Sequence, residues 1–160
     1  MNIKSPIVVI CTFLWIGFVT GISFLEAPLK FQAPHITLAL GLGIGRLVFA
    51  ALNKVEWVLA LAIAFSLFRQ PSGWGGKNLL FVVPLLVLLA QTVWLLPALD
   101  ARAELYIQGV SVPHSYLHVY YVLAEVIKIG CLLTFGLKLF HKPISQFDLS
   151  SQTVKQTVSL

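Results

Sequence analysis

Long apolar runs separated by short polar clusters form the main pattern of this chain. The first uncharged run covers residues 6–25, and further apolar segments extend over about 49–68, 78–108 and 112–141. An α-helix needs about 20 mainly apolar residues to cross the ~30 Å hydrocarbon core of a bilayer. The pattern therefore predicts an all-α integral membrane protein, built as a four-helix transmembrane bundle.

The third and fourth predicted helices are longer than a bilayer requires. The third begins near Asn78 and meets no strong stop before Gly109, so about 30 residues at ~1.5 Å each give it a length of roughly 45 Å. Ser111 is the expected N-cap of the fourth helix, with Pro113 in its first turn. We therefore expect an extended hairpin of helices three and four that projects beyond the membrane.

Residues 27–48 interrupt this pattern. Prolines and glycines recur through an otherwise apolar segment, at Pro28, Pro34, Gly41, Gly43 and Gly45. The uncharged stretch that they leave is too short to cross a bilayer alone. We expect an interfacial or re-entrant piece here, followed by a spanning helix over 49–68, which places Lys54 and Glu56 near one membrane surface.

Composition mainly excludes other classes of protein. Hydrophobic residues make up 58% of the chain and charged residues 11%, far from the usual balance of a soluble domain. We expect a single transmembrane domain over residues 1–142 and a polar cytoplasmic tail over 143–160, which lacks the periodicity of a packed element. The formal net charge is +5, but the basic residues are scattered at helix ends. This pattern argues against nucleic acid as a partner, so the partner that we expect is the lipid bilayer.

Basic residues also predict the orientation. If four helices alternate in direction, the residues on one side are Lys4, Arg69, Lys77, Lys138, Lys142 and Lys155. The residues on the other side are Lys30, Arg46, Lys54 and Arg102. The positive-inside rule then places both termini in the cytoplasm. We expect a multi-pass protein of a bacterial inner membrane.

Polar residues line one face of the last predicted helix. At about 100° per residue, an arc of about 80° contains His114, His118, Tyr121, Glu125 and Lys128. Titratable groups on a spanning helix must face protein or water rather than lipid. Counting back from the hairpin turn places Arg102 level with His118, and Gln91 level with Lys128. The predicted intramembrane polar or ion site therefore consists of Glu125, Lys128, Tyr121, His118, Arg102 and Gln91.

Glu125 and Lys128 are the most informative pair in this site. Each charge costs roughly 2.5–3.5 kcal/mol at the centre of a spanning helix. At a spacing of i, i+3 the two side chains can neutralise each other. Two interpretations stay open, a polar clamp that fixes helix packing and a site that binds or relays an ion or a proton.

Catalytic motifs are missing from the sequence, which contains no Ser/His/Asp pattern, no CxxC and no phosphate-binding loop. We therefore predict a non-enzymatic small transporter, permeation element or accessory membrane subunit, with no cofactor. The alternative is a membrane redox, metal or haem protein that uses His114 and His118. Two imidazoles one turn apart cannot ligate opposite faces of one haem iron, and zinc would need a further ligand.

Gly17 and Gly21 have the small-xxx-small spacing that lets two helix backbones approach closely. This spacing is common both inside monomers and at oligomer interfaces. We expect close packing within the monomer, while a homo-oligomer or a partner membrane subunit stays open.

Four short segments carry a resemblance to a known family, namely FVTGISFLEAPLKF, GRLVF, LPALDAR and YLH. In their order the chain resembles the four-helix membrane family typified by transmembrane protein 205 and by bacterial domains of unknown function. The resemblance implies a four-helix membrane fold, with recurring positions at Pro28, Arg46, Pro97, Arg102 and His118. Glu125 and Lys128 depart from the family pattern, in which uncharged polar groups are expected.

Overall fold

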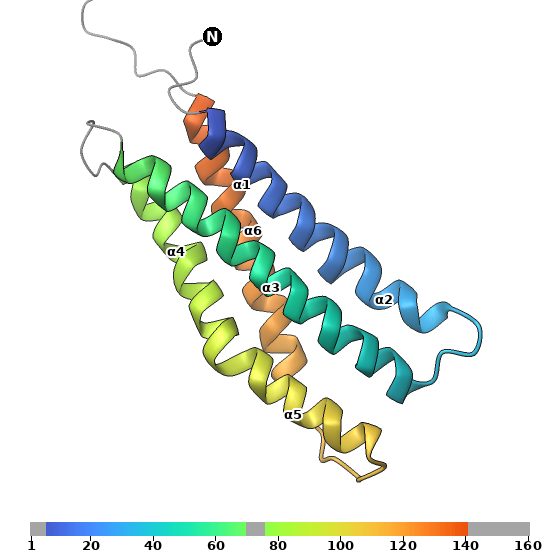
Figure 1. Cartoon of the computed structure of the whole chain (residues 1–160). Helices are drawn as coiled ribbons and strands as arrows, with labels where there is room; N and C mark the ends of the chain where they lie inside the picture. The colour runs from blue at the N-terminus through green and yellow to red at the C-terminus, as the bar shows by residue number, and fades with distance from the viewer. Residues whose placement is uncertain (1–5, 70–75, 141–160) are drawn as a thin grey trace, which may run out of the picture.

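The computed structural model describes residues 6–69 and 76–140, and within these ranges all regular structure is helical (Figure 1). The helices long and apolar enough to cross a membrane are Pro6–Gln32, Leu38–Phe68 and Leu79–Ile107. The prediction of an all-α protein with membrane-spanning helices is confirmed at this level. The predicted tail at 143–160 lies outside the described residues.

The first helix runs further than predicted. It consists of α1 (Pro6–Val19), the π-helical η1 (Thr20–Glu26), α2 (Ala27–Leu29) and the 3₁₀ turn η2 (Lys30–Gln32). Pro28 does not end it near Leu25, because the wide π-helical turns precede this proline. A proline removes one backbone hydrogen bond and crowds the carbonyl four residues earlier, and a π-helical segment loosens the backbone at that point.

The second long helix, α3 (Leu38–Phe68), begins well before the expected position near residue 49. Its N-cap is Thr37, whose hydroxyl accepts a hydrogen bond from the Leu40 backbone N–H at 3.2 Å. Residues 27–48 are therefore no separate interfacial or re-entrant piece. They complete the first helix, turn, and enter α3.

Tertiary contact explains why α3 continues through its glycines. A Cβ atom built on Gly41 would lie 2.2 Å from Cε1 of Phe31, and one on Gly45 would lie 3.0 Å from Nζ of Lys30. Each glycine costs about 1 kcal/mol of helix propensity relative to alanine. The absent side chains make room for the end of the first helix, which offsets that cost.

The third long helix is continuous, as predicted, through α4 (Gly76–Ala90), the π-helical η3 (Gln91–Leu95) and α5 (Leu96–Ile107). Gly109 follows it with a φ of 76°, a left-handed conformation that favours glycine and stops the helix. The last helix, α6 (Leu117–Phe140), begins later than predicted. Ser115 accepts a hydrogen bond from the Leu117 N–H at 3.2 Å, so Ser115 and not Ser111 caps this helix.

The helices run up and down beside one another (Figure 1). Here α1 packs on α3 and α6, α3 packs on α5, and α4 packs on α6. We call the end with the turns at 33–37 and 108–116 the hairpin end, and the opposite end, where α1 begins and α6 finishes, the terminal end. The buried apolar core near the terminal end includes Val8, Ile63, Phe81, Leu132 and Phe135.

Gly17 and Gly21 do not mark a close helix contact within the monomer. A Cβ atom built on either glycine would have no other described heavy atom within 4 Å, apart from its own chain neighbours. The expected tight packing at these positions is therefore not found. Close contacts occur instead at Gly41 and Gly45 of α3, and at Gly136 of α6, where a Cβ atom would lie 3.2 Å from the Phe13 ring on α1.

Candidate functional site: a buried charge cluster beside a cavity

Four polar side chains meet in the interior of the helices, and we call them the central cluster. They are Glu56 from α3, Gln91 from the start of η3, and Glu125 and Lys128 from α6. None of them is more than 1% exposed. Three of the four, all except Glu56, belong to the polar site predicted from the sequence.

Lys128 is the hub of the central cluster. Its Nζ donates to Oε1 of Gln91 at 2.6 Å and to Oε1 of Glu125 at 3.3 Å. It also forms an ion pair with Glu56 across the helix interface. Gln91 in turn donates from Nε2 to Oε1 of Glu125 at 2.9 Å. One ammonium group therefore holds carboxylates from two helices.

Trp15 on α1 completes the cluster, because its indole N–H donates to Oε1 of Glu56 at 2.7 Å. Trp15 lies in the middle of the uncharged run at 6–25. The cluster therefore lies about halfway along this uncharged run. Buried polar groups at this depth must find partners in the protein, because lipid offers none.

The cluster contains one more acid than base. With all three groups ionised, one ammonium and two carboxylates leave one net negative charge. Oε2 of Glu56 and Oε2 of Glu125 accept no hydrogen bond from a described residue, although Oε2 of Glu125 lies 3.2 Å from the Lys128 ammonium nitrogen. An uncompensated charge in a low-dielectric interior is strongly unfavourable. Neutralising the cluster would therefore take one further positive charge.

A proton suits this position better than a metal ion. Lys128 already lies between the two carboxylates, so a metal cation would have to bind beside an ammonium group. Two like charges a few ångströms apart repel strongly where water is excluded. A proton on one carboxyl group adds no such repulsion and converts that group into a hydrogen-bond donor.

Glu56 reaches the cluster because it lies on the buried face of α3. That face is formed by Gly41, Gly45, Leu52, Asn53, Glu56, Ala60 and Ile63. The expectation that Glu56 lies near a membrane surface is therefore incorrect. Its neighbour Lys54 is exposed on the outer side of the same helix.

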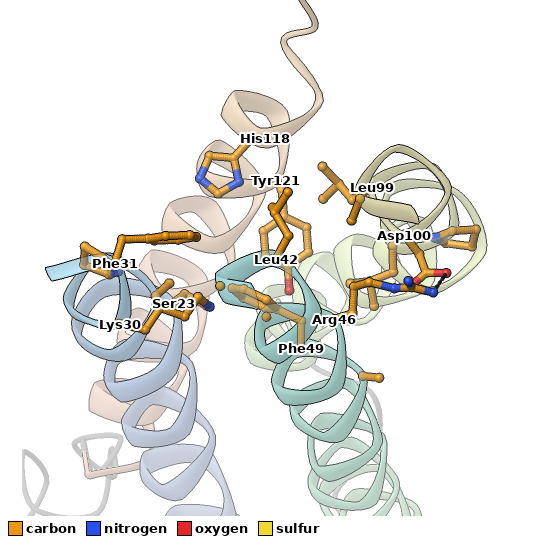
Figure 2. Close-up of a pocket in the computed structure, with 18 of the residues that line it drawn as sticks. Ser23, Lys30, Phe31, Leu42, Arg46, Phe49, Leu99, Asp100, His118 and Tyr121 are labelled. Atoms are coloured by element: carbon orange, nitrogen blue, oxygen red, sulfur yellow. Dashed lines mark hydrogen bonds and ion pairs between the residues drawn. The ribbon is translucent and has the colours of Figure 1, made fainter. Parts of the chain in front are cut away.

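A cavity of about 720 Å³ lies between the cluster and the hairpin end (Figure 2). This volume is within the ~300–1,000 Å³ that is typical of small-molecule sites. Tyr121 lines the cavity, lies one turn before Glu125 on α6, and is 3% exposed. Its ring packs edge-on against Phe49, with 5.3 Å between the centroids. Tyr121 therefore separates the cavity from the cluster.

An ion-pair group bounds the cavity on the side of α5. Arg46 Nε and Asp100 Oδ1 are 2.5 Å apart, Nη2 and Oδ2 are 3.0 Å apart, and Nη1 pairs with Glu104. This forked arrangement matches the planar guanidinium to a carboxylate and ties α3 to α5. Arg46 is therefore already matched by two acids.

The remaining predicted site residues are distributed more widely. His118 is exposed and lines the cavity, on the face that leads to Tyr121 (Figure 2). Arg102 is not part of the cluster, because its guanidinium donates to the Pro113 carbonyl in the hairpin turn. His114 lies before α6 begins and packs edge-on against Tyr116, with 5.3 Å between the ring centroids.

The histidine pair does not have the geometry that the metal alternative assumed. His114 is not helical, so it is not one helical turn from His118. Among residues 6–69 and 76–140, no group of three His, Cys, Asp or Glu side chains is placed to hold a metal ion. His114 therefore belongs to the hairpin turn, and His118 belongs to the mouth of the cavity.

Comparisons with known proteins give no further constraint. No family model, no curated protein and no solved structure matches the chain. Its function is accordingly inferred from the central cluster and the cavity.

Proposed function

We propose that this is a non-enzymatic, multi-pass membrane protein whose central cluster takes up and releases a proton, as part of a small transporter. One observation carries the proposal: Glu56 and Glu125 share the single ammonium group of Lys128 in the interior. A structural clamp needs one acid for one base. Because Lys128 balances only one carboxylate, the second acid can carry a proton or release it, and the cluster has two protonation states.

The proposal includes α6 as a fourth spanning helix. Its cluster partners lie on α3 and η3, both within candidate spans, so its polar face is matched by protein. Its outward side chains are apolar and suited to lipid, among them Leu123, Val126, Ile127, Leu133 and Leu137. The positive-inside rule supports cytoplasmic termini, which places the hairpin end and the cavity outside.

Access to the cluster supports a transporter over an open permeation path. Toward the hairpin end, Tyr121 lines the cavity and lies one turn before Glu125 on α6. Toward the terminal end, Ile63, Phe81, Leu132 and Phe135 form an apolar core. A proton would therefore reach the cavity past the Tyr121 side chain, and reaching the other side requires a rearrangement of the helices.

Family membership is also part of the proposal. Four of the five positions that the resemblance to the transmembrane protein 205 family marks, Pro28, Arg46, Pro97 and His118, line the cavity. These residues come from four helices, namely the first helix, α3, α5 and α6. Their convergence supports a shared site at this place in the fold.

Infrared difference spectroscopy can test the extra proton directly. The purified protein in lipid should show the C=O stretch of a protonated carboxyl group at neutral pH. Both Glu56→Gln and Glu125→Gln should abolish this band, because either change leaves one acid and one base. Glu104→Gln, which is outside the cluster, should preserve it. A missing band, or a band that survives both cluster variants, would refute the proposal.

Proton movement is tested in proteoliposomes with a trapped pH-sensitive dye and an imposed membrane potential. The wild type should admit protons faster than empty vesicles, and both cluster variants should lower that rate at least about a hundredfold, the lower end of the range for a positioned proton-transfer group. Glu104→Gln is again the matched control. Equal rates for the wild type and both cluster variants would contradict a role in transport.

A further inference from the structure

The Lys30 ammonium in the wall of the cavity has unused hydrogen-bonding capacity. Its side chain is only 10% exposed, and its ion pair with Glu26 spans 3.4 Å. Charge-assisted pairs of this kind are usually about 2.7–2.9 Å long. An ammonium group has three donors. The aromatic rings of Phe31 and Phe49 lie near the nitrogen, at 5.6 and 5.5 Å from their centroids.

Ser23 supplies a second and independent sign of a missing ligand. Ser23 is one of the residues that line the cavity, and its Oγ is buried and has no hydrogen-bond partner among the described residues. Other helical hydroxyls in this protein donate to the carbonyl four residues earlier, as Thr12, Ser66, Thr92 and Thr134 do. Ser23, in the π-helical η1, makes no such bond. Leaving a buried hydroxyl without a hydrogen-bond partner is unfavourable, because the group has lost its water and gained nothing in return.

Lys30 and Ser23 lie on the same wall of the cavity. They are two helical turns apart, and side chains in a helix lean toward its N-terminus, which brings the Lys30 ammonium back toward Ser23. Figure 2 shows the two residues together on the wall formed by the first helix. On α3 the missing side chain of Gly45 leaves room for the ammonium group.

The rest of the cavity wall is largely apolar. Its aromatic and aliphatic members include Phe24, Phe31, Leu42, Phe49, Leu96 and Leu99. The other lining cation, Arg46, is matched by Asp100 and Glu104. A ligand would therefore meet one localised positive site and an extended apolar surface.

We infer that this cavity binds an amphipathic anion, with its carboxylate or phosphate head on Lys30 and Ser23 and its hydrocarbon chain along the apolar wall. Two oxygens of such a head can accept one hydrogen bond each from the ammonium and the hydroxyl. The binding site stands on the cavity alone. That the ligand is the substrate carried with the proton rests on the function proposed above.

Radiolabelled laurate is the probe for this inference. The full chain in nanodiscs of a zwitterionic lipid should bind one laurate saturably, after subtraction of binding to empty nanodiscs. Dodecanol and dodecyltrimethylammonium have the same chain with a neutral or positive head, and they should compete at least about tenfold more weakly, the effect expected for one lost charge-assisted bond.

Three variants locate the head of the ligand. Lys30→Met should weaken laurate binding at least about tenfold, and Lys30→Arg should restore most of it. Ser23→Ala should give a smaller loss. The matched control is Lys54→Met, the same replacement at an exposed lysine of α3 outside the cavity, and it should bind as the wild type does. Thermal unfolding of each variant establishes that it is folded.

Anionic phospholipid is the other source of the same chemistry. Native mass spectrometry from nanodiscs doped with phosphatidylglycerol should show Lys30-dependent retention if a lipid head occupies the site, and laurate should displace it. Retention without displacement identifies a lipid site, and displacement identifies a site for free amphiphiles. Both outcomes support an amphipathic anion.

The inference is overturned if laurate and phosphatidylglycerol both fail to bind above empty nanodiscs. It is equally overturned if folded Lys30→Met binds them as the wild type does, or if dodecanol competes as well as laurate. Glu125→Gln separates this test from the proposed function, because it should abolish proton uptake and leave laurate binding intact.

Discussion

Glu56 on α3 and Lys128 on α6 form an ion pair in which neither side chain is more than 1% exposed. Lys128 also pairs with Glu125 at 3.2 Å on its own helix. Its charge is therefore shared by two acids that approach it from different helices. Removing the base and removing one acid should have very different consequences.

Lys128→Met should be among the most destabilising single changes in this protein. It leaves the two buried acids without a base, so the carboxylate that stays ionised beside the protonated one has no counter-charge, and stranding a buried charge typically costs about 3–5 kcal/mol. Glu125→Gln leaves the Glu56–Lys128 pair balanced and should cost about 1–1.5 kcal/mol, the value of a hydrogen bond. Thermal unfolding in detergent measures both effects.

Acidic buffer should partly restore the stability of Lys128→Met, because protonation removes the unpaired negative charge. Lys138→Met, at an exposed position of the same helix, is the control and should unfold like the wild type. Equal destabilisation by Lys128→Met and Glu125→Gln would show that Glu56 does not substitute for Glu125.

Trp15→Phe should destabilise the protein by about 1.5–3 kcal/mol, the usual value of a hydrogen bond to a charged group. Phenylalanine keeps an aromatic ring in the site but cannot donate to Glu56, which Trp15 contacts at 2.7 Å. Trp94→Phe changes a side chain that is 58% exposed and should have little effect. The same melting temperature for both variants would count against the indole bond.

Gly41→Ala should lower the stability by about 1–3 kcal/mol, the usual cost of overpacking. Its new Cβ atom would overlap the Phe31 ring, so that ring would have to leave its place against α3. Gly21→Ala meets no described atom within 4 Å and should be neutral or slightly stabilising. If Gly21→Ala instead changes the elution volume on size exclusion, that glycine lies at a contact between copies.

A cysteine at Gln108 should react with a membrane-impermeant maleimide added to intact cells, after Cys11 and Cys131 have been replaced by alanine. The position lies at the hairpin end, which the proposed orientation places outside. A cysteine at Arg69, at the terminal end, should react only after the cells are permeabilised. The reverse labelling pattern would invert the topology.

Hydrophobic patterning identified the long apolar helices because a spanning helix must satisfy its backbone internally and present apolar side chains to lipid. The polar residues on one face of the last helix, with Gln91 at the level of Lys128, also predicted that Gln91, Glu125 and Lys128 belong to one site, and the structure brings them together. Counting residues along a hairpin predicts how far along the helix axis a residue lies, but not on which side of the helix its side chain points. Arg102 has the expected height and nevertheless turns toward the Pro113 carbonyl.

Glu56 was missed because the start of α3 was placed too late. Three glycines lower helix propensity, and only the packing of Phe31 on Gly41 and of Lys30 on Gly45 shows why the helix continues. With α3 beginning near residue 49, Glu56 falls close to a helix end. From the sequence alone, Glu125→Gln would be expected to leave Lys128 without a counter-charge. In the structure, Glu56 supplies a second acid for Lys128.

The buried cluster also determines the order in which the chain can be assembled in the membrane. Glu125 and Lys128 would each cost roughly 2.5–3.5 kcal/mol if α6 entered lipid alone. Their partners Glu56 and Gln91 lie on segments that leave the ribosome earlier. The last helix is therefore expected to insert against helices that are already in place, so that its biogenesis depends on the correct docking of α3 and η3.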